Sequence, residues 1–156
     1  MERLNILVGC EKSGIVRDSF RKRGHNAYSC DLVETDRPSK YHLKCDIRKA
    51  IRAGGDSWDM LIFFPPCTHL ARSGAKWFSP KSAWFRPEKI QLQRDSIQFV
   101  KDIWNEAEDI PRIGMENPCG VLTKQFRHWD QIVSPNWFGD RIQKLTCLWL
   151  KNLPPP

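Results

Sequence analysis

Short apolar runs alternate with amphipathic stretches along this 156-residue chain. Residues 4–9 form an apolar run that ends in glycine, which predicts a buried strand. In residues 13–23, Val16 and Phe20 lie at helical spacing among charged side chains, and Gly24 is placed to end a helix. Along the whole chain, the pattern predicts strands at residues 4–9, 26–30, 42–45, 60–64, 113–115 and 145–150, and helices at residues 13–23, 47–53 and 88–106.

Strands separated by helices favour parallel pairing with right-handed crossovers. We therefore expect an α/β fold in which residues 1–156 form a single domain on a mostly parallel, doubly wound sheet with helices on both faces. In such sheets ligands bind beyond the carboxyl ends of the strands, where the strand order switches. The segments expected at that edge are residues 10–14, Asp31, Asp46, residues 65–69 and residues 116–119.

The turn Pro65-Pro66-Cys67 carries the most specific chemical signal. Its two prolines stop the preceding strand, because proline cannot donate to a strand ladder. A thiol at the carboxyl edge of the sheet suits a nucleophile, whereas a buried thiol would pack as a small hydrophobe. Glu116 ends the next long strand on the same edge. If protonated, its carboxyl group can donate to N3 of a cytosine ring; alternatively it binds loop amides as a structural carboxylate.

The loop of residues 9–14 joins the first strand to the first helix. Backbone amides at the helix start can face a ligand there, and Gly14 allows a close approach. Asp31 ends the second strand, where a carboxylate can accept hydrogen bonds from ribose hydroxyls. Asp46 follows the third strand and can contact an adenine amino group or cap the next helix, and the cap is the favoured interpretation.

Residues 68–87 form a long basic and aromatic connection that contains two similar Trp-Phe-x-Pro stretches. Loops of this length inside a domain are usually functional, and aromatic rings beside cations suit base stacking and phosphate contact. The alternative is a lid of tryptophans that only packs on the core. The residues predicted to contact nucleic acid are Lys76, Trp77, Lys81, Trp84, Arg86 and Lys89.

Composition narrows the function classes. The formal net charge of +7 favours a polyanionic partner, although a solvated positive surface would give the same charge. The apolar runs are too short to cross a membrane and the amino-terminal residues lack the layout of a signal peptide, so we expect a cytoplasmic protein. The six cysteines are scattered without a C-x-x-C pair, so neither a metal site nor a disulfide framework is predicted.

The order of these motifs resembles the DNA (cytosine-5) methyltransferases, with Pro65-Pro66-Cys67 and Glu116-Asn117 as the most specific match. The resemblance extends over residues 4–116 and includes a possible last strand. It implies a minimal, Rossmann-like S-adenosylmethionine-dependent methyltransferase domain without a target-recognition domain, of a size that suits a phage or mobile element. The residues that it implies for cofactor binding are Gly9, Cys10, Glu11, Ser13, Gly14, Asp31, Asp46 and Pro65.

The same resemblance implies methyl transfer to cytosine C5 in DNA, with Cys67 adding to C6 while Glu116 holds N3. A partner chain or a homodimer would then supply target recognition. The chain departs from the family pattern in its first loop and at Pro118, where the family has valine. Two alternatives stay open: a non-catalytic DNA-binding or accessory module, and an enzyme that modifies free pyrimidine nucleotides.

Overall fold

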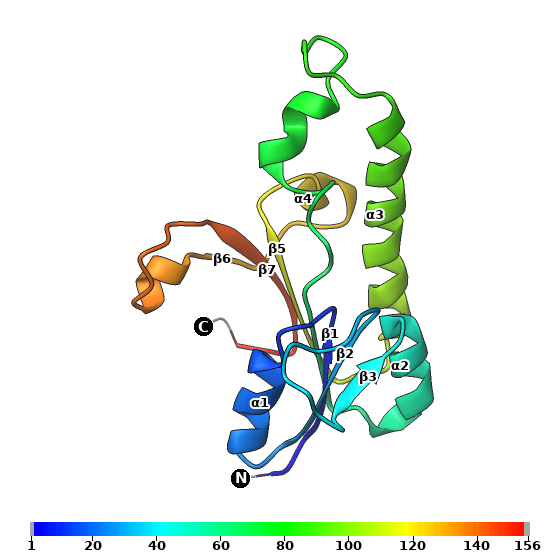
Figure 1. Ribbon diagram of the computed structural model, residues 1–156, viewed down its shortest axis with the longest axis vertical. Helices are drawn as coiled ribbons and strands as arrows, with labels where there is room; N and C mark the ends of the chain where they lie inside the picture. Colours follow the sequence, from blue (N-terminus) through cyan, green and yellow to red (C-terminus); the bar gives the residue numbers. More distant parts are fainter. Residues whose placement is uncertain (1, 155–156) are drawn as a thin grey trace.

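The computed structural model describes residues 2–154, which form a seven-stranded sheet with helices on both faces (Figure 1). The strands are β1 (Asn5–Gly9), β2 (Asn26–Asp31), β3 (His42–Lys44), β4 (Met60–Phe63), β5 (Arg112–Pro118), β6 (Gln131–Val133) and β7 (Thr146–Lys151). The α-helices are α1 (Ile15–Lys22), α2 (Ile47–Gly54), α3 (Glu88–Glu106) and α4 (Leu122–Gln125), and the 3-10 helices are η1 (Gly55–Ser57), η2 (Arg72–Trp77) and η3 (Pro135–Phe138).

The strand order is β3-β2-β1-β4-β5-β7-β6. Strands β1 to β5 pair in parallel, whereas β7 runs antiparallel to both β5 and β6. The predicted mostly parallel α/β sheet is thus confirmed, and the antiparallel pairs are those that β7 makes. The connection from β5 to β7 contains the short elements α4, β6 and η3. Strands β6 and β7 form an antiparallel hairpin, which returns β7 beside β5 in the opposite direction.

Helices cover both faces because the buried strands send apolar side chains to each side in turn. In β1, Ile6 and Val8 pack with residues of α1 on one face. Leu7 between them points to the opposite face, where it joins the larger core with Ile51 of α2 and Ile103 of α3. The expected arrangement of helices on both faces is therefore confirmed.

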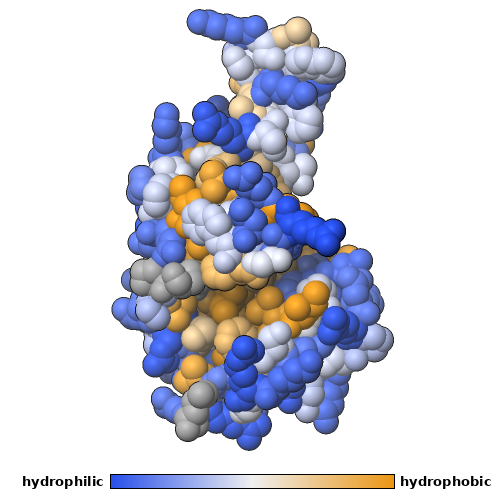
Figure 2. Space-filling model, turned by 90° about the vertical axis from the view of Figure 1, so that its left-hand side faces the viewer, coloured by the Kyte–Doolittle hydropathy of each residue, from blue (hydrophilic) through white to orange (hydrophobic). Residues whose placement is uncertain are grey.

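Helix α3 extends beyond the sheet at its amino-terminal end. Of its 19 residues, Val100 and Ile103 in the carboxyl-terminal half are the buried ones. Residues 72–87, here called the arm, form η2 and a turn at the amino-terminal end of α3, and they project away from the sheet (Figure 1). In the space-filling view the arm is the narrow projection at the top of the molecule (Figure 2).

Each helix and strand predicted from the sequence is present with bounds shifted by a few residues. The largest shift is in β5, which is longer than the predicted strand 113–115 and extends past Glu116 to Pro118. The short elements α4 and β6 were not predicted from the hydrophobic pattern. None of the helices within residues 2–154 is both long enough and apolar enough to cross a lipid bilayer.

Candidate functional site

A small cavity opens at the carboxyl ends of the strands, beside the point where the strand order reverses. The reversal lies at β1, which has β2 on one side and β4 on the other. The cavity has a volume of about 100 Å³ and is here called the switch-point cavity. Its lining residues come from the ends of four strands and from α2 and α3: Cys10, Cys30, Asp31, Leu32, Cys45, Asp46, Ile47, Pro66 and Phe99.

Three residues that the sequence predicted for cofactor binding line this cavity together: Cys10, Asp31 and Asp46. Burial, followed by the nearby negative charges of the two aspartates, raises the pKa of the Cys10 thiol to about 12. Cys10 therefore stays a neutral thiol at physiological pH, and the charge of the cavity comes from the two carboxylates. Cys10 also has a positive φ of 54°, which is uncommon for a non-glycine residue and is often found at ligand sites.

Glu11 and Gly9, which were also predicted in the first loop, have structural contacts within the protein. The Glu11 side chain is 5% exposed, and its Oε1 accepts hydrogen bonds from the Val16 amide (3.1 Å) and the Ser13 hydroxyl (2.7 Å). These contacts cap the start of α1. Gly9 is required by close packing, because a Cβ atom there would lie 2.0 Å from Ile47 Cδ1. Of this set, Gly9, Glu11, Ser13, Gly14 and Pro65 do not line the switch-point cavity.

Asp31 and Asp46 differ in how many hydrogen bonds and ion pairs their carboxylates form within the protein. Asp46 caps α2 by accepting from the Arg48 amide (2.8 Å), and it also forms an ion pair with the Arg48 guanidinium (2.8 Å). The Arg48 side-chain hydrogen bond holds the pKa of Asp46 below its usual value. Asp31 accepts one long bond from the Val33 amide (3.3 Å). The cap favoured for Asp46 is confirmed, and Asp31 keeps more capacity to bind a ligand.

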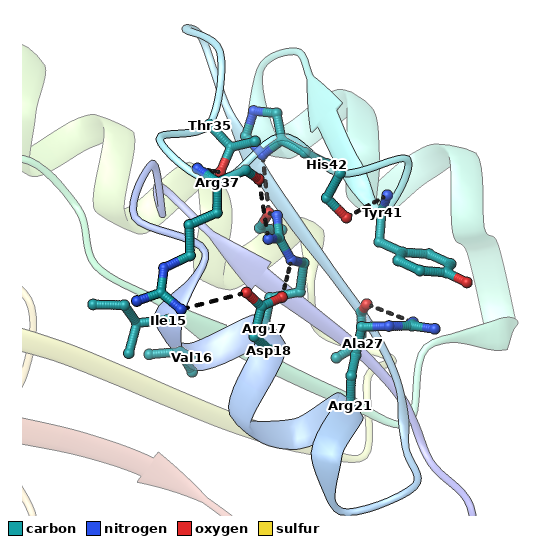
Figure 3. Close-up of polar contacts among 12 residues, drawn as sticks. Ile15, Val16, Arg17, Asp18, Arg21, Ala27, Thr35, Arg37, Tyr41 and His42 are labelled. Atoms are coloured by element: carbon teal, nitrogen blue, oxygen red, sulfur yellow. Dashed lines mark hydrogen bonds and ion pairs between the residues drawn. The ribbon is translucent and has the colours of Figure 1, made fainter.

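A buried arginine fixes the segment that follows Asp31 (Figure 3). Arg17 is 1% exposed and donates to Asp18 Oδ1 (2.9 Å), Ser29 Oγ (2.9 Å) and the Arg37 carbonyl (3.4 Å). His42 bridges Ser29 Oγ and the Val33 carbonyl, each at 2.9 Å. The loop between β2 and β3 is therefore held against α1, and Asp31 at its start is held with it.

The Pro65-Pro66-Cys67 turn is fixed by the neighbouring strand β5. Asn117 is 1% exposed and its Nδ2 donates to the Pro65 carbonyl (2.8 Å). The Cys67 carbonyl accepts from the amides of Leu70 and Ala71, both at 3.0 Å, which closes the next turn. Pro65 is buried and the Cys67 side chain is half-buried. The predicted nucleophile thus lies at the carboxyl edge of the sheet on a turn that adjacent strands hold in place.

Glu116 reaches the same edge from β5. Since β4 and β5 are parallel neighbours with Phe63 paired to Met115, Glu116 follows that pair and Cys67 lies a few residues beyond it. The Thr146 hydroxyl of β7 donates to Glu116 Oε1. Two backbone bonds join the loops after β4 and β5, from the Arg72 amide to the Cys119 carbonyl (2.9 Å) and from the Val121 amide to the Leu70 carbonyl (3.0 Å). Cys67 and Glu116 therefore lie at the carboxyl ends of neighbouring strands, and the loops that follow these strands are hydrogen-bonded to each other.

Five of the six residues predicted to contact nucleic acid lie in the arm, and the sixth, Lys89, lies next to it in the first turn of α3. Lys89 Nζ lies 4.0 Å from the centre of the Trp77 ring, and Lys76 Nζ lies 4.9 Å from the centre of the Trp84 ring. Trp84 is 58% exposed, and Lys81 and Arg86 are exposed on the same projection. The Arg86 amide donates to the Trp77 carbonyl (2.8 Å), which closes the arm's turn. The tryptophans stack with lysines away from the core rather than forming a lid over it.

Several residues of this edge were not predicted from the sequence. Phe99 lies on α3, 32 residues after Cys67, and lines the switch-point cavity only because the helix passes over it. Asn117 was noted as part of a motif, but its bond to Pro65 depends on strand pairing. The exposed Trp137 and Phe138 lie between Pro135 and Gly139, a pattern that signals a turn presenting aromatic side chains.

Comparison with known proteins gives a likeness in fold. No family model matches the chain, and no curated protein matches it. A crystal structure of WbdD is similar, with a TM-score of 0.50 and 10% sequence identity. The match covers 97% of this chain and 36% of that one, so this chain spans about a third of the length of its structural neighbour. At this identity the likeness shows the fold alone: the chain has a mixed, mostly parallel α/β sheet that is compatible with a Rossmann-like fold.

Proposed function

We propose that this chain is an S-adenosylmethionine-dependent methyltransferase that acts on cytosine C5 in DNA. The observation that carries the proposal is that Cys67, in the fixed turn after β4, and Glu116, near the carboxyl end of the adjacent parallel strand β5, lie at the same end of the sheet. A soft nucleophile and a carboxyl group on one edge are the two groups needed to attack C6 of a pyrimidine while binding N3. The motif resemblance supports the same reaction class.

Two features of the switch-point cavity support S-adenosylmethionine as the methyl donor. Asp31 has free acceptor capacity for ribose hydroxyls, and Leu32, Ile47 and Phe99 give apolar walls for an adenine ring. When bound, S-adenosylmethionine supplies an electrophilic methyl group. The part of the protein is to hold Asp31 through the Arg17 cluster and to keep the cavity beside the Cys67 turn, since Pro66 lines it.

In the proposed reaction the target cytosine leaves the base stack and enters the space between the side chains of Cys67 and Glu116, at the carboxyl ends of the strands. Cys67 gives up its thiol proton and forms a bond from Sγ to C6, and the carboxyl group of Glu116 hydrogen-bonds to N3 and stabilises the charge that develops in the ring. C5 then takes the methyl group. Loss of the C5 proton restores the ring and breaks the bond from Sγ to C6, which returns Cys67 to its starting state.

The decisive experiment incubates the protein with tritiated S-adenosylmethionine and mixed-sequence DNA and analyses the nucleosides. We expect labelled 5-methylcytosine from the wild type and none from Cys67→Ser, because a serine hydroxyl is a far weaker nucleophile toward C6. Thr68→Ala is the matched control, since it changes an exposed neighbour in the same turn. DNA containing 5-fluorocytosine should trap a covalent adduct with Thr68→Ala but not with Cys67→Ser.

Full transfer by Cys67→Ser would contradict the nucleophile assignment. A second candidate function is a non-catalytic nucleic-acid-binding module, and the first loop favours it, because Glu11 and Ser13 cap α1 instead of facing the cavity. Calorimetry with S-adenosylmethionine separates the two functions. DNA binding without cofactor binding or label transfer would establish the module, and label in free cytidine nucleotides but not in DNA would establish a nucleotide-modifying enzyme.

A further inference from the structure

A second surface of mixed aromatic and cationic character lies beside the proposed active edge. Residues 134–145 connect β6 to β7 and are here called the hairpin loop. They include η3, and they carry four large apolar side chains that are more than half exposed: Trp137 (60%), Phe138 (68%), Ile142 (61%) and Leu145 (52%). Figure 2 shows apolar side chains among polar ones on the face of the molecule that carries this loop. Apolar surface of this kind commonly marks an interaction site.

The hairpin loop is held in shape by its own backbone. Ser134 is 1% exposed and its hydroxyl oxygen accepts from the Lys144 amide (3.1 Å), which joins the two ends of the loop. The Asp140 amide donates to the Pro135 carbonyl (3.2 Å), and Gly139 turns the chain with a φ of 91°. The exposed aromatic side chains are therefore presented on an ordered turn, which reduces the entropy lost when they bind.

A groove of about 890 Å³ runs from the arm, past the segment that follows β5, to Leu145 at the end of the hairpin loop. Its lining comes from both sides, with Phe78 and Arg72 from the arm and Leu145 from the hairpin loop, while Trp129 and Lys124 lie between them. The lining contains two cations and no carboxylate. Aromatic and aliphatic walls combined with cations suit unstacked bases joined by phosphates, whereas an apolar peptide or a lipid would leave the cations unpaired.

The groove is continuous with the proposed active edge. Cys119, Gly120 and Val121 line it, and they follow Glu116 in β5. Gly120 packs so closely on the Cys67 loop that a Cβ atom would lie 1.8 Å from the Leu70 carbonyl oxygen. A strand of nucleic acid in the groove would therefore run next to the turn that carries Cys67.

We infer that the groove and the hairpin loop bind a single nucleic-acid strand, with bases stacking on Trp137 and Phe138 and phosphates paired with Arg72 and Lys124. The inference rests on the proposed function for the claim that these nucleotides flank the target base. It assigns recognition of the substrate to a surface that extends beyond the arm, from Arg72 past Lys124 to the hairpin loop.

The test measures binding of a fluorescein-labelled single-stranded oligodeoxynucleotide of about 12 nucleotides by anisotropy. We expect the double variant Trp137→Ala/Phe138→Ala to lose about tenfold or more in affinity, since two stacking platforms are removed. Ile15→Ala is the control, because Ile15 is 53% exposed on α1 and lies outside the groove lining. Affinity for S-adenosylmethionine, measured on the same samples, should be equal in wild type and double variant.

The contribution of the two groove cations is tested separately, by the salt dependence of the affinity for the oligonucleotide. Arg72→Ala/Lys124→Ala should make the slope of log affinity against log salt shallower by about 1 to 1.5, since each phosphate contact on a single strand contributes about 0.7. Lys22→Ala, which removes an exposed charge on α1, should leave the slope unchanged.

Unchanged oligonucleotide affinity in both double variants overturns the inference. Dissociation of a dimer by Trp137→Ala/Phe138→Ala at constant oligonucleotide affinity also overturns it, because a second copy of the chain would then cover the hairpin loop. A different result would contradict the proposed function while leaving this inference intact. If the wild type neither binds S-adenosylmethionine nor transfers label, while the hairpin-loop variant still loses oligonucleotide affinity, the nucleic-acid surface stands without the methyltransferase.

Discussion

Arg17 and Asp31 contribute to the switch-point cavity in two different ways, one through structure and one through ligand binding. Arg17 is enclosed by the protein and satisfies its charge through Asp18, Ser29 and the Arg37 carbonyl. Asp31 has acceptor capacity left after its one long bond to the Val33 amide. The first residue orders the segment, and the second is available to a ligand. Substitution at the two positions should therefore separate stability from binding.

Arg17→Ala should lower the free energy of unfolding by about 2–4 kcal/mol, because it removes a buried cation and leaves the buried Ser29 hydroxyl without this donor. Urea denaturation followed by circular dichroism measures the change. Arg23→Ala is the control, since Arg23 is exposed and bonds only to the Ser19 carbonyl of its own helix end. Equal stability of the two variants would show that the Arg17 cluster contributes little.

Asp31→Ala should weaken S-adenosylmethionine binding by about tenfold while leaving the midpoint of urea unfolding nearly unchanged. The expected loss is that of a charge-assisted hydrogen bond to a ligand hydroxyl. Isothermal titration calorimetry gives the affinity directly. The matched control is Asp36→Ala, which breaks an exposed ion pair with Lys12 (3.0 Å) and should alter neither quantity appreciably. If Asp31→Ala binds as well as the control, the cofactor assignment of Asp31 is wrong.

Helix α2 begins at the cavity, and its first turn depends on Asp46. Asp46→Ala should destabilise the protein by about 1 kcal/mol, because it removes the side-chain cap from the Arg48 amide. Asp46→Asn should cost less, since asparagine is an equally good cap. Thermal unfolding of the three proteins at neutral pH measures this order. If alanine and asparagine cost the same, the helix does not use this cap.

The contribution of Asp46 should also depend on pH. Its pKa in the folded protein is below the usual value, chiefly because of the hydrogen bond from the Arg48 side chain. A depressed folded pKa stabilises the protein above the unfolded pKa, and this stabilisation is lost as the pH falls through the folded value. The difference in stability between wild type and Asp46→Ala should therefore shrink on acidification below pH ~4, and urea titrations at neutral and acidic pH would detect it.

Helices and strands with a clear period could be predicted from the sequence, whereas short elements could not. The strands β1 and β4 are continuous apolar runs, and α3 repeats apolar residues over five turns. The three residues of β6 have no such repeat, and they form a strand only because β7 pairs with them. Likewise α4 is a single turn. Their existence depends on tertiary contacts between segments that local pattern does not contain.

Some features of the candidate site could likewise be predicted from the sequence, and others could not. Cys10, Asp31 and Asp46 could be predicted to lie together, because each follows a strand and the carboxyl ends of parallel strands meet at one edge. The hydrogen bond that Glu11 accepts from the Val16 amide could not be predicted, since it depends on how the loop turns after Cys10. The groove was also not foreseen, because its walls come from the arm and from the hairpin loop, which are far apart in sequence.

Across the whole molecule, the switch-point cavity is assembled from segments between Cys10 and Phe99 and exists only when the sheet is formed. A ligand bound there should therefore stabilise the folded chain. We expect S-adenosylmethionine at 100 times its dissociation constant to add about 2.7 kcal/mol to the free energy of unfolding. Differential scanning fluorimetry at rising cofactor concentration would show the increase. Asp31→Ala should need more cofactor for the same shift, and no shift for the wild type would argue against this site.

The direction of β7 determines what can be joined to this protein without blocking it. Asn5 opens β1, and Lys151 closes β7 opposite Ile113, near the start of β5, so both lie at the edge of the sheet away from Cys67. A tether or a fused recognition module attached beside either residue would leave the reactive edge facing outward. To reach the substrate, its linker would have to travel the length of the strands, about 17 Å, or roughly five extended residues.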